Sequence, residues 1–176
     1  MFPPPPSPET LRLADGGEIT LRPVRPEDQP AIADAIRTAS RETLLHRFFT
    51  PLRALAPEEL HRLLHIDPAR EYCVVGEVAD GRIVCGARYV RMPVSGRAEI
   101  ALTVHDDFQR RGLGRHLLRH LIRQGRADGI HTFVADVMAD NSGMLKLLRD
   151  MAPHRHADFG AGVCHVEFDL NDAVTN

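Results

Sequence analysis

The stretch Val104–Leu118, VHDDFQRRGLGRHLL, joins two segments of different hydrophobic period. Before it, apolar residues alternate with polar ones over Arg97–Asp106, which is typical of a strand. After it, leucines recur at the spacing of one helix face from Leu113 onward. A strand, a glycine turn and a helix start make an anion site, because the first N–H groups of the helix point outward and Gly112 and Gly114 admit a close ligand.

The segments on either side of this turn predict one mixed α/β domain over residues 17–170, with residues 1–16 as a flexible proline-rich tail and 171–176 as a C-terminal tail. Alternation and turn residues predict strands at 17–24, 71–78, 82–92, 97–106, 128–139 and 162–170. Helical periods and capping residues predict helices over 25–39, 40–49, 56–66, 113 onward and 140–151.

Composition narrows the function classes. The chain has 176 residues and a net charge of −2, and this balance argues against a nucleic-acid partner. No apolar run approaches the roughly 20 residues of a membrane span, and the first residues lack the pattern of a signal peptide. Three widely spaced cysteines indicate reduced thiols, so we expect a cytoplasmic protein.

The glycine turn has several candidate ligands, and a surface turn without any ligand is the alternative. A P-loop needs GxxxxGK[ST], which the chain lacks. A dinucleotide site needs a third glycine, which GLGRHL does not supply, so an NAD-dependent oxidoreductase is a weaker hypothesis. Judged by the glycines alone, a surface turn with solvated arginines and no ligand is still an open hypothesis.

The segment VHDDFQRRGLGRHLL closely resembles motif A of the GNAT superfamily of N-acetyltransferases, Q/R-x-x-G-x-G/A. The order of the expected elements from Glu18 to Leu170 is similar to that family as well. The resemblance implies a mostly antiparallel twisted sheet flanked by helices, and acetyl-CoA as co-substrate. It implies that the turn holds the pyrophosphate of coenzyme A, with cofactor contacts from Leu102, Val104, Gln109, Arg110, Arg111, Gly112, Leu113, Gly114, Arg115 and Asn141. For Asn141, helix capping is an equal alternative.

Three further segments, SRETLLHRFF, LHRLLHIDPAREYCVVGEV and AEIALTVHDDFQRRGLG, resemble the GNAT domains of Pat-type protein lysine acetyltransferases. This narrower resemblance implies a protein lysine as acceptor, with acyl-CoA synthetases as the target class, and Glu99 as the general base. If apolar neighbours enclose Glu99, they would raise the pKa of its carboxyl group and make it a stronger base. The alternative for Glu99 is a solvated strand residue. The tyrosine that many GNAT enzymes place in the helix after the asparagine is replaced by Leu148.

The remaining expectations concern the acceptor side. Arg47 and Phe48 fall where the first helices of the family line the acceptor site, and ordinary surface charge is their alternative. The pairs His61/His65 and His116/His120 lack the glutamate of HExxH, so no metal is expected. A small-molecule amine acetyltransferase and a non-catalytic acyl-CoA-binding module are the rival functions, and oligomerisation is left open.

Overall fold

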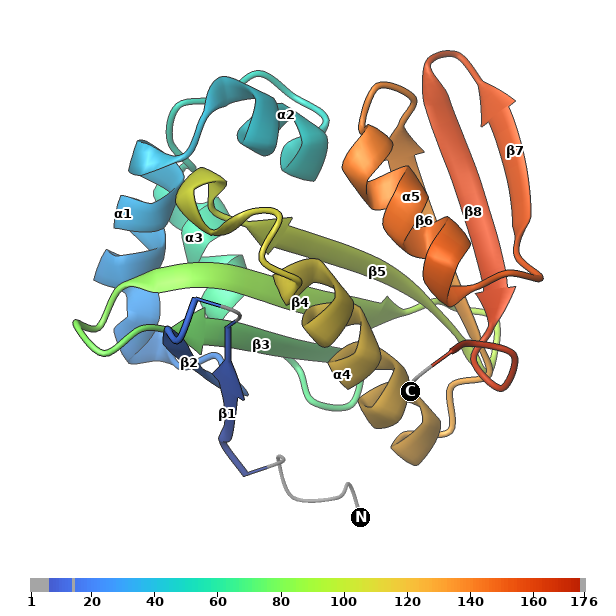
Figure 1. Cartoon of the computed structure of the whole chain (residues 1–176), viewed down its shortest axis with the longest axis horizontal. Helices are drawn as coiled ribbons and strands as arrows, with labels where there is room; N and C mark the ends of the chain where they lie inside the picture. The colour runs from blue at the N-terminus through green and yellow to red at the C-terminus, as the bar shows by residue number, and fades with distance from the viewer. Residues whose placement is uncertain (1–6, 14, 175–176) are drawn as a thin grey trace.

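An eight-stranded mixed sheet runs through the computed structural model, which describes residues 7–13 and 15–174 (Figure 1). Its strand order is β1-β2-β3-β4-β5-β6-β8-β7. Every neighbouring pair is antiparallel except β5 and β6, which are parallel. The strands are β1 (Glu9–Arg12), β2 (Glu18–Pro23), β3 (Glu71–Glu77), β4 (Ile83–Arg91), β5 (Arg97–Val104), β6 (Thr132–Met138), β7 (His156–Gly160) and β8 (Val163–Asp169). The expected mostly antiparallel sheet is confirmed.

Five α-helices connect these strands, and local capping explains where several of them begin. Ser40 accepts a hydrogen bond from the N–H of Thr43 at 3.1 Å, and Asn141 accepts one from Met144 at 3.1 Å. The helices are α1 (Gln29–Thr38), α2 (Arg41–Phe48), α3 (Pro57–Leu64), α4 (Leu113–Ala127) and α5 (Ser142–Met151), with short 3₁₀ turns at Pro26–Asp28 and Asp106–Phe108.

The helices cover both faces of the sheet, and each face has its own core. Helices α4 and α5 pack on one face, where Leu117, Leu118 and Leu148 are fully buried. On the other face α1 and α3 cover Val75 and Ile83 (Figure 1). The apolar stripe of α4 explains this placement, because its burial removes several leucines from water at about 1.5–3 kcal/mol each.

Two strands differ from the sequence prediction. Strand β1 lies within the segment expected to be a tail, and it pairs with β2 while Leu11 joins the core. The first six residues of that tail lie outside the described part. Strand β7 was missed because its side chains are mostly exposed and show no clean alternation. At the other end, Ala173 is buried, so the described part of the predicted C-terminal tail packs on the domain.

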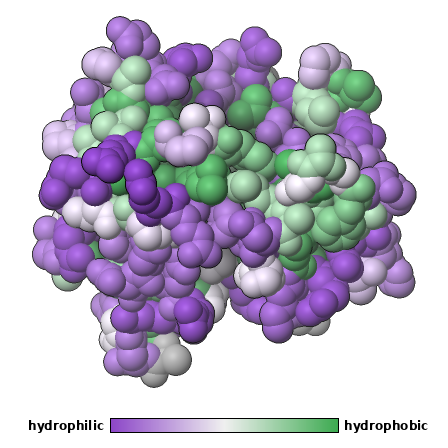
Figure 2. Space-filling view, turned by 90° about the horizontal axis from the view of Figure 1, so that it is seen from above, coloured by the Kyte–Doolittle hydropathy of each residue, from purple (hydrophilic) through white to green (hydrophobic). Residues whose placement is uncertain are grey.

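The surface is mostly hydrophilic, with hydrophobic patches on the face seen from above (Figure 2). The exposed large apolar side chains are Phe49, Val94, Phe159 and Val174. Across residues 7–13 and 15–174, no helix has the length and apolarity needed to cross a membrane.

Candidate functional site

Strands β5 and β6 separate part-way along their length. Their parallel pairing covers only Arg97–Glu99 against Thr132–Val134, although both strands continue. On its other edge β5 stays paired with β4 as far as Val104. The second half of β5 therefore has one edge with no strand partner in the described sheet.

The direction of the backbone groups along β5 follows from one hydrogen bond just beyond it. The N–H of His105 donates to the carbonyl of Val84 on β4 at 2.8 Å. Because alternate residues of an antiparallel pair direct their polar groups to the partner, those of Leu102 and Val104 point the other way, toward β6. Both residues are among the cofactor contacts that the family resemblance implies.

The loop after β5 presents free backbone donors at the start of α4. Arg110 and Gly112 have φ angles of 60° and 84°, in the left-handed region that favours glycine. Among the described residues, no protein acceptor receives the N–H groups of residues 110–115. The first N–H group that donates within the protein is that of His116, which donates to the carbonyl of Gly112 at 3.2 Å. Together with the helix dipole, this row of donors makes an anion site.

The long side chains of the loop contact the protein. Arg111 Nη1 lies 2.6 Å from Asp15 Oδ2, and its guanidinium lies 5.1 Å from the centre of the Phe108 ring. Arg115 lies 3.8 Å from Asp150 on α5, whereas the Arg110 side chain is exposed. A Cβ on Gly114 would lie 3.2 Å from Leu147, so this glycine allows α4 and α5 to approach closely.

Gln109 fastens the loop to its surroundings. Its Nε2 donates to the carbonyl of Val104 at 3.1 Å and to Thr43 Oγ1 on α2 at 3.0 Å. The amide side chain is therefore engaged within the protein, and its hydrogen bonds connect the loop to β5 and α2.

Asp106 extends this connection to the start of α2. Its carboxylate accepts hydrogen bonds from Ser40 N at 2.8 Å, Ser40 Oγ at 2.6 Å and Thr43 Oγ1 at 2.8 Å. Burial by itself would raise the pKa of Asp106, but these donors outweigh it and lower the pKa below its ordinary value. Sequence reasoning missed this role, since an Asp-Asp pair before a turn is typical of solvated residues.

Glu99 lies on the face of β5 that carries Ala101 and Thr103, which line a cavity of about 130 Å³. The expectation that apolar neighbours enclose Glu99 is wrong, because its side chain is exposed. Glu99 itself is not among the residues that line the cavity, which lies beneath α1 and α2. The carboxylate therefore has access to solvent and to an incoming ligand.

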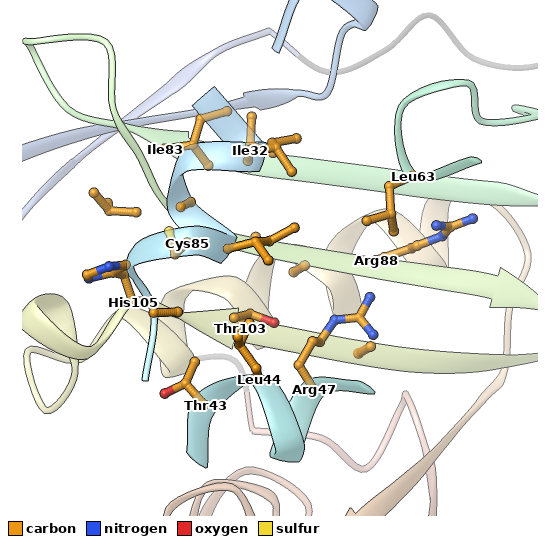
Figure 3. Close-up of a pocket in the computed structure, with 18 of the residues that line it drawn as sticks. Ile32, Thr43, Leu44, Arg47, Leu63, Ile83, Cys85, Arg88, Thr103 and His105 are labelled. Carbon is orange, nitrogen blue, oxygen red and sulfur yellow. The ribbon is translucent and has the colours of Figure 1, made fainter. Parts of the chain in front are cut away.

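Arg47 and Phe48, which the sequence analysis assigned to the acceptor side, both line this cavity. Figure 3 shows Arg47 in that lining. The Arg47 guanidinium lies 5.0 Å from the centre of the Phe48 ring. Burial is the main cause that lowers the pKa of Arg47; the nearby Arg88 lowers it too, while the charge of Glu99 raises it. Arg88 was missed, because an arginine in an alternating strand reads as solvated.

The residues around α5 fill structural roles. Asn141 caps the helix through Oδ1, and Leu148 is fully buried in the core.

Neither tyrosine is free: the Tyr72 hydroxyl lies 2.7 Å from His120 Nε2, and the Tyr89 hydroxyl donates to Asp128. Burial is the largest cause that raises the pKa of both phenols.

The described residues contain no group of three or more His, Cys, Asp or Glu side chains arranged to hold a metal ion. His61 and His65 stack on each other with ring centres 3.7 Å apart, and His120 is buried against Tyr72. The three cysteines are free thiols.

Comparisons with known proteins agree with this geometry. Residues 36–152 match the acetyltransferase (GNAT) family. The chain is 35% identical over 174 residues to acetyltransferase Pat of Mycolicibacterium smegmatis, and it covers 51% of that protein and 96% of itself. It is 33% identical to an acetyltransferase of Pseudomonas aeruginosa, over 77% of this chain and 74% of that protein.

A solved structure extends the agreement to three dimensions. The GNAT domain of S. lividans PAT superposes with a TM-score of 0.84 at 29% identity, over 92% of this chain and 96% of that one. The chain thus spans about half the length of the M. smegmatis relative and nearly all of this separate domain.

Proposed function

The chain belongs to the acetyltransferase (GNAT) family, and from this we propose that it transfers an acetyl group from acetyl-CoA to the side-chain amine of a protein lysine. The observation that carries the proposal is the separation of β5 from β6 beside a loop of free N–H groups. An extended ligand with an anionic end fits this combination, since one edge of β5 offers backbone partners and the loop offers donors for charge.

Acetyl-CoA is such a ligand. Its pyrophosphate would bind the backbone donors of Arg110, Arg111, Gly112, Leu113, Gly114 and Arg115, and its pantetheine amides would pair with Leu102 and Val104. Gln109 supports the loop through Val104 and Thr43, and Asn141 supports α5 beside it. Arg111 would keep Asp15 as its partner or exchange it for a phosphate oxygen.

Glu99 is the proposed general base. A lysine amine is protonated at neutral pH, so one proton must leave before its nitrogen can attack. The Glu99 carboxylate, directly or through one water, takes that proton; the nitrogen lone pair then forms the C–N bond at the thioester carbonyl. The amine loses its second proton as the C–S bond breaks, and the products are the amide and the coenzyme A thiol.

The other two requirements are met by the backbone and by solvent. The N–H of Leu102 or Val104 stabilises the carbonyl oxygen as it gains negative charge. Leu148 occupies the position of the usual tyrosine acid and is buried, so the departing thiolate takes the second amine proton through a water, or through Glu99 after that carboxyl has released the first proton to solvent. By such a route the proposed reaction needs no tyrosine as general acid for the thiolate.

The acceptor would approach along the face that carries Glu99, between α2 and β4, where Arg47 and Phe48 line the cavity. The likeness to a Pat acetyltransferase and to the PAT domain supports a protein lysine over a small amine. Acyl-CoA synthetases, the target class that the Pat-type resemblance implies, are the first proteins to test.

The test follows thiol release and acetyl-lysine together, with acetyl-CoA and a panel of acyl-CoA synthetases, polyamines, aminoglycosides and amino acids. We expect transfer to a synthetase lysine, and a fall of about 10²–10⁴-fold in turnover for Glu99→Gln, with coenzyme A affinity unchanged. Glu27→Gln is the matched control, because Glu27 is exposed and lies on the 3₁₀ turn before α1.

The alternatives give different results. Thiol release with small amines alone would keep the acetyl transfer and discard the protein acceptor. Coenzyme A binding without transfer to any amine would favour the non-catalytic acyl-CoA-binding module. Full turnover in Glu99→Gln would remove the glutamate from the mechanism.

A further inference from the structure

Two adjoining hollows under α2 and α3 are lined by more positive than negative side chains. The first is the cavity of about 130 Å³ beside Thr103, and the second, of about 270 Å³, is bounded by α3 and the loop before it. They share Phe48, Leu63 and Arg88, so they lie side by side. Their charged lining consists of three arginines, at positions 47, 62 and 88, and one glutamate, Glu59.

Arg47 and Arg88 both line this space, and both have N–H groups without an acceptor among the described residues. In the described part of the chain, the contact of the Arg47 guanidinium is the ring of Phe48, and no carboxylate or carbonyl accepts its N–H groups. Arg88 pairs with Glu71 through Nη2, but its buried Nε has no partner among the described residues. Figure 3 shows both side chains at the same end of the cavity, together with Leu63. Buried donors without acceptors are costly, which favours a ligand that supplies oxygen atoms.

The carboxylates near these arginines are already committed. Glu59 accepts the N–H of Ala56 at 2.9 Å as part of the cap of α3. Glu71 pairs with Arg88, and the charge of Glu99 acts on Arg47. In the proposed reaction the incoming lysine ammonium pairs with the Glu99 carboxylate. Arg47 is then left without a negatively charged neighbour.

Resting on the proposed function, we infer that the two hollows bind an acidic side chain of the acceptor, so that the preferred target is a lysine with an Asp or Glu close to it in sequence. A guanidinium binds a carboxylate through two parallel hydrogen bonds, which gives orientation as well as charge. Phe48, Leu55 and Leu63 supply apolar walls for the methylene groups of the same segment. The acceptor thus restores the charge balance that its own ammonium disturbs.

The experiment compares peptides that carry one lysine and differ at a single position. A glutamate is moved from three residues before the lysine to three residues after it, and each peptide is matched with glutamine and arginine at the same place, so that every peptide keeps a single acceptor. We expect kcat/KM to be about tenfold higher for the best glutamate peptide than for its glutamine partner, equivalent to ~1.4 kcal/mol. The preference should shrink as salt is added.

Arg62 gives the sharpest variant, because its side chain is exposed and its replacement leaves the core intact. Arg62→Gln should reduce the preference several-fold, and Arg62→Glu should shift it toward the arginine-flanked peptide. Arg47→Gln should remove most of it, with the melting temperature as a check on folding. Arg82→Gln is the matched control, since Arg82 lies at the β3–β4 turn and lines neither hollow.

Equal acetylation of all peptides would overturn the inference and leave the proposed function standing. If only small amines react, free lysine is compared with cadaverine, which lacks the carboxylate. A preference for lysine there would support the carboxylate site while the protein acceptor is discarded, and equal rates would overturn it. No transfer to any amine would overturn both proposals.

Discussion

His120 shows how a single buried residue sets a pH dependence. Its Nε2 lies 2.7 Å from the Tyr72 hydroxyl of β3, and its Nδ1 lies 3.4 Å from Glu9 of β1. Burial lowers the pKa of His120 most, the hydrogen bond with Glu9 raises it, and the charge of Arg123 lowers it. The net direction is downward, so the folded protein binds this proton less readily than the unfolded chain.

We therefore expect the free energy of unfolding to fall as the pH drops below about 6.5, where an unfolded histidine takes up its proton. The slope contributed by His120 is at most about 1.4 kcal/mol per pH unit. Urea unfolding at pH 8, 7, 6 and 5.5 checks this for the wild type and His120→Gln, and the difference between them should narrow toward low pH. A constant difference would contradict the assignment, and the exposed His154→Gln should follow the wild type.

The arginines that line the two hollows show which properties of single residues a sequence does not reveal. Arg47 was placed beside the acceptor through a family resemblance, and the structure puts it in the cavity lining. Arg62 and Arg88 gave no signal, because a charged residue on a helix or strand face is normally solvated. Only the packing of α3 over β4 brings them to the same hollow.

At the scale of elements, Asp106 connects the start of α2 to the loop that precedes α4. Its three hydrogen bonds with Ser40 and Thr43 join the first turn of α2 to this loop. Asp106→Asn should lower the free energy of unfolding by about 1.5–3 kcal/mol at pH 7, because charged hydrogen bonds are lost. It should also raise the KM for the amine acceptor more than the Kd for coenzyme A.

The pH dependence of this loss has a definite sign. The pKa of Asp106 is below its ordinary value in the folded protein, so its contribution is present above about pH 3.9 and disappears as the pH falls through the folded value. Denaturant unfolding at pH 7, 5 and 4 should show the wild type approaching Asp106→Asn. Asp107→Asn, at the exposed neighbouring carboxylate, should have no comparable effect, and an equal loss there would refute the specific role of Asp106.

Elements with a strong local pattern were predicted, and elements without one were not. The leucine period of α4, the caps Ser40 and Asn141 and the alternation of β5 are all readable along the chain. Strands β1 and β7 lie at the two edges of the sheet, where one side of the strand has no partner and few side chains are buried. Their pairing depends on β2 and β8, which no local window contains.

On the scale of the whole molecule, the sheet consists of two halves that meet at a short junction. Strands β1–β5 form one half and β6–β8 the other, and only three residue pairs join β5 to β6. Helices α4 and α5 add contacts across the junction (Figure 1). The order of elements along the chain and a mostly antiparallel sheet were expected from the family resemblance, but the length of the junction depends on register, which sequence patterns leave undetermined.

Coenzyme A bound along β5 and at the start of α4 would bridge these two halves. At a concentration 100 times its Kd, a ligand that binds only the folded state adds about 2.7 kcal/mol to the free energy of unfolding. For a domain of this size we expect a rise in melting temperature of about 5–11 °C. NAD, which needs the third glycine that the loop lacks, should leave the melting temperature unchanged.

Hydrogen exchange would show whether the stabilisation comes from this junction. The amides of Leu102 and Val104, and those of β6 beyond Val134, should exchange more slowly with coenzyme A bound, because the ligand supplies the partners that the separated strands lack. The exposed strand β7 provides the internal comparison. Protection confined to the loop at Gly112 would mean that the anion alone is held and that the gap between the strands is not the binding path. Equal stabilisation by NAD would return the glycine turn to the dinucleotide hypothesis.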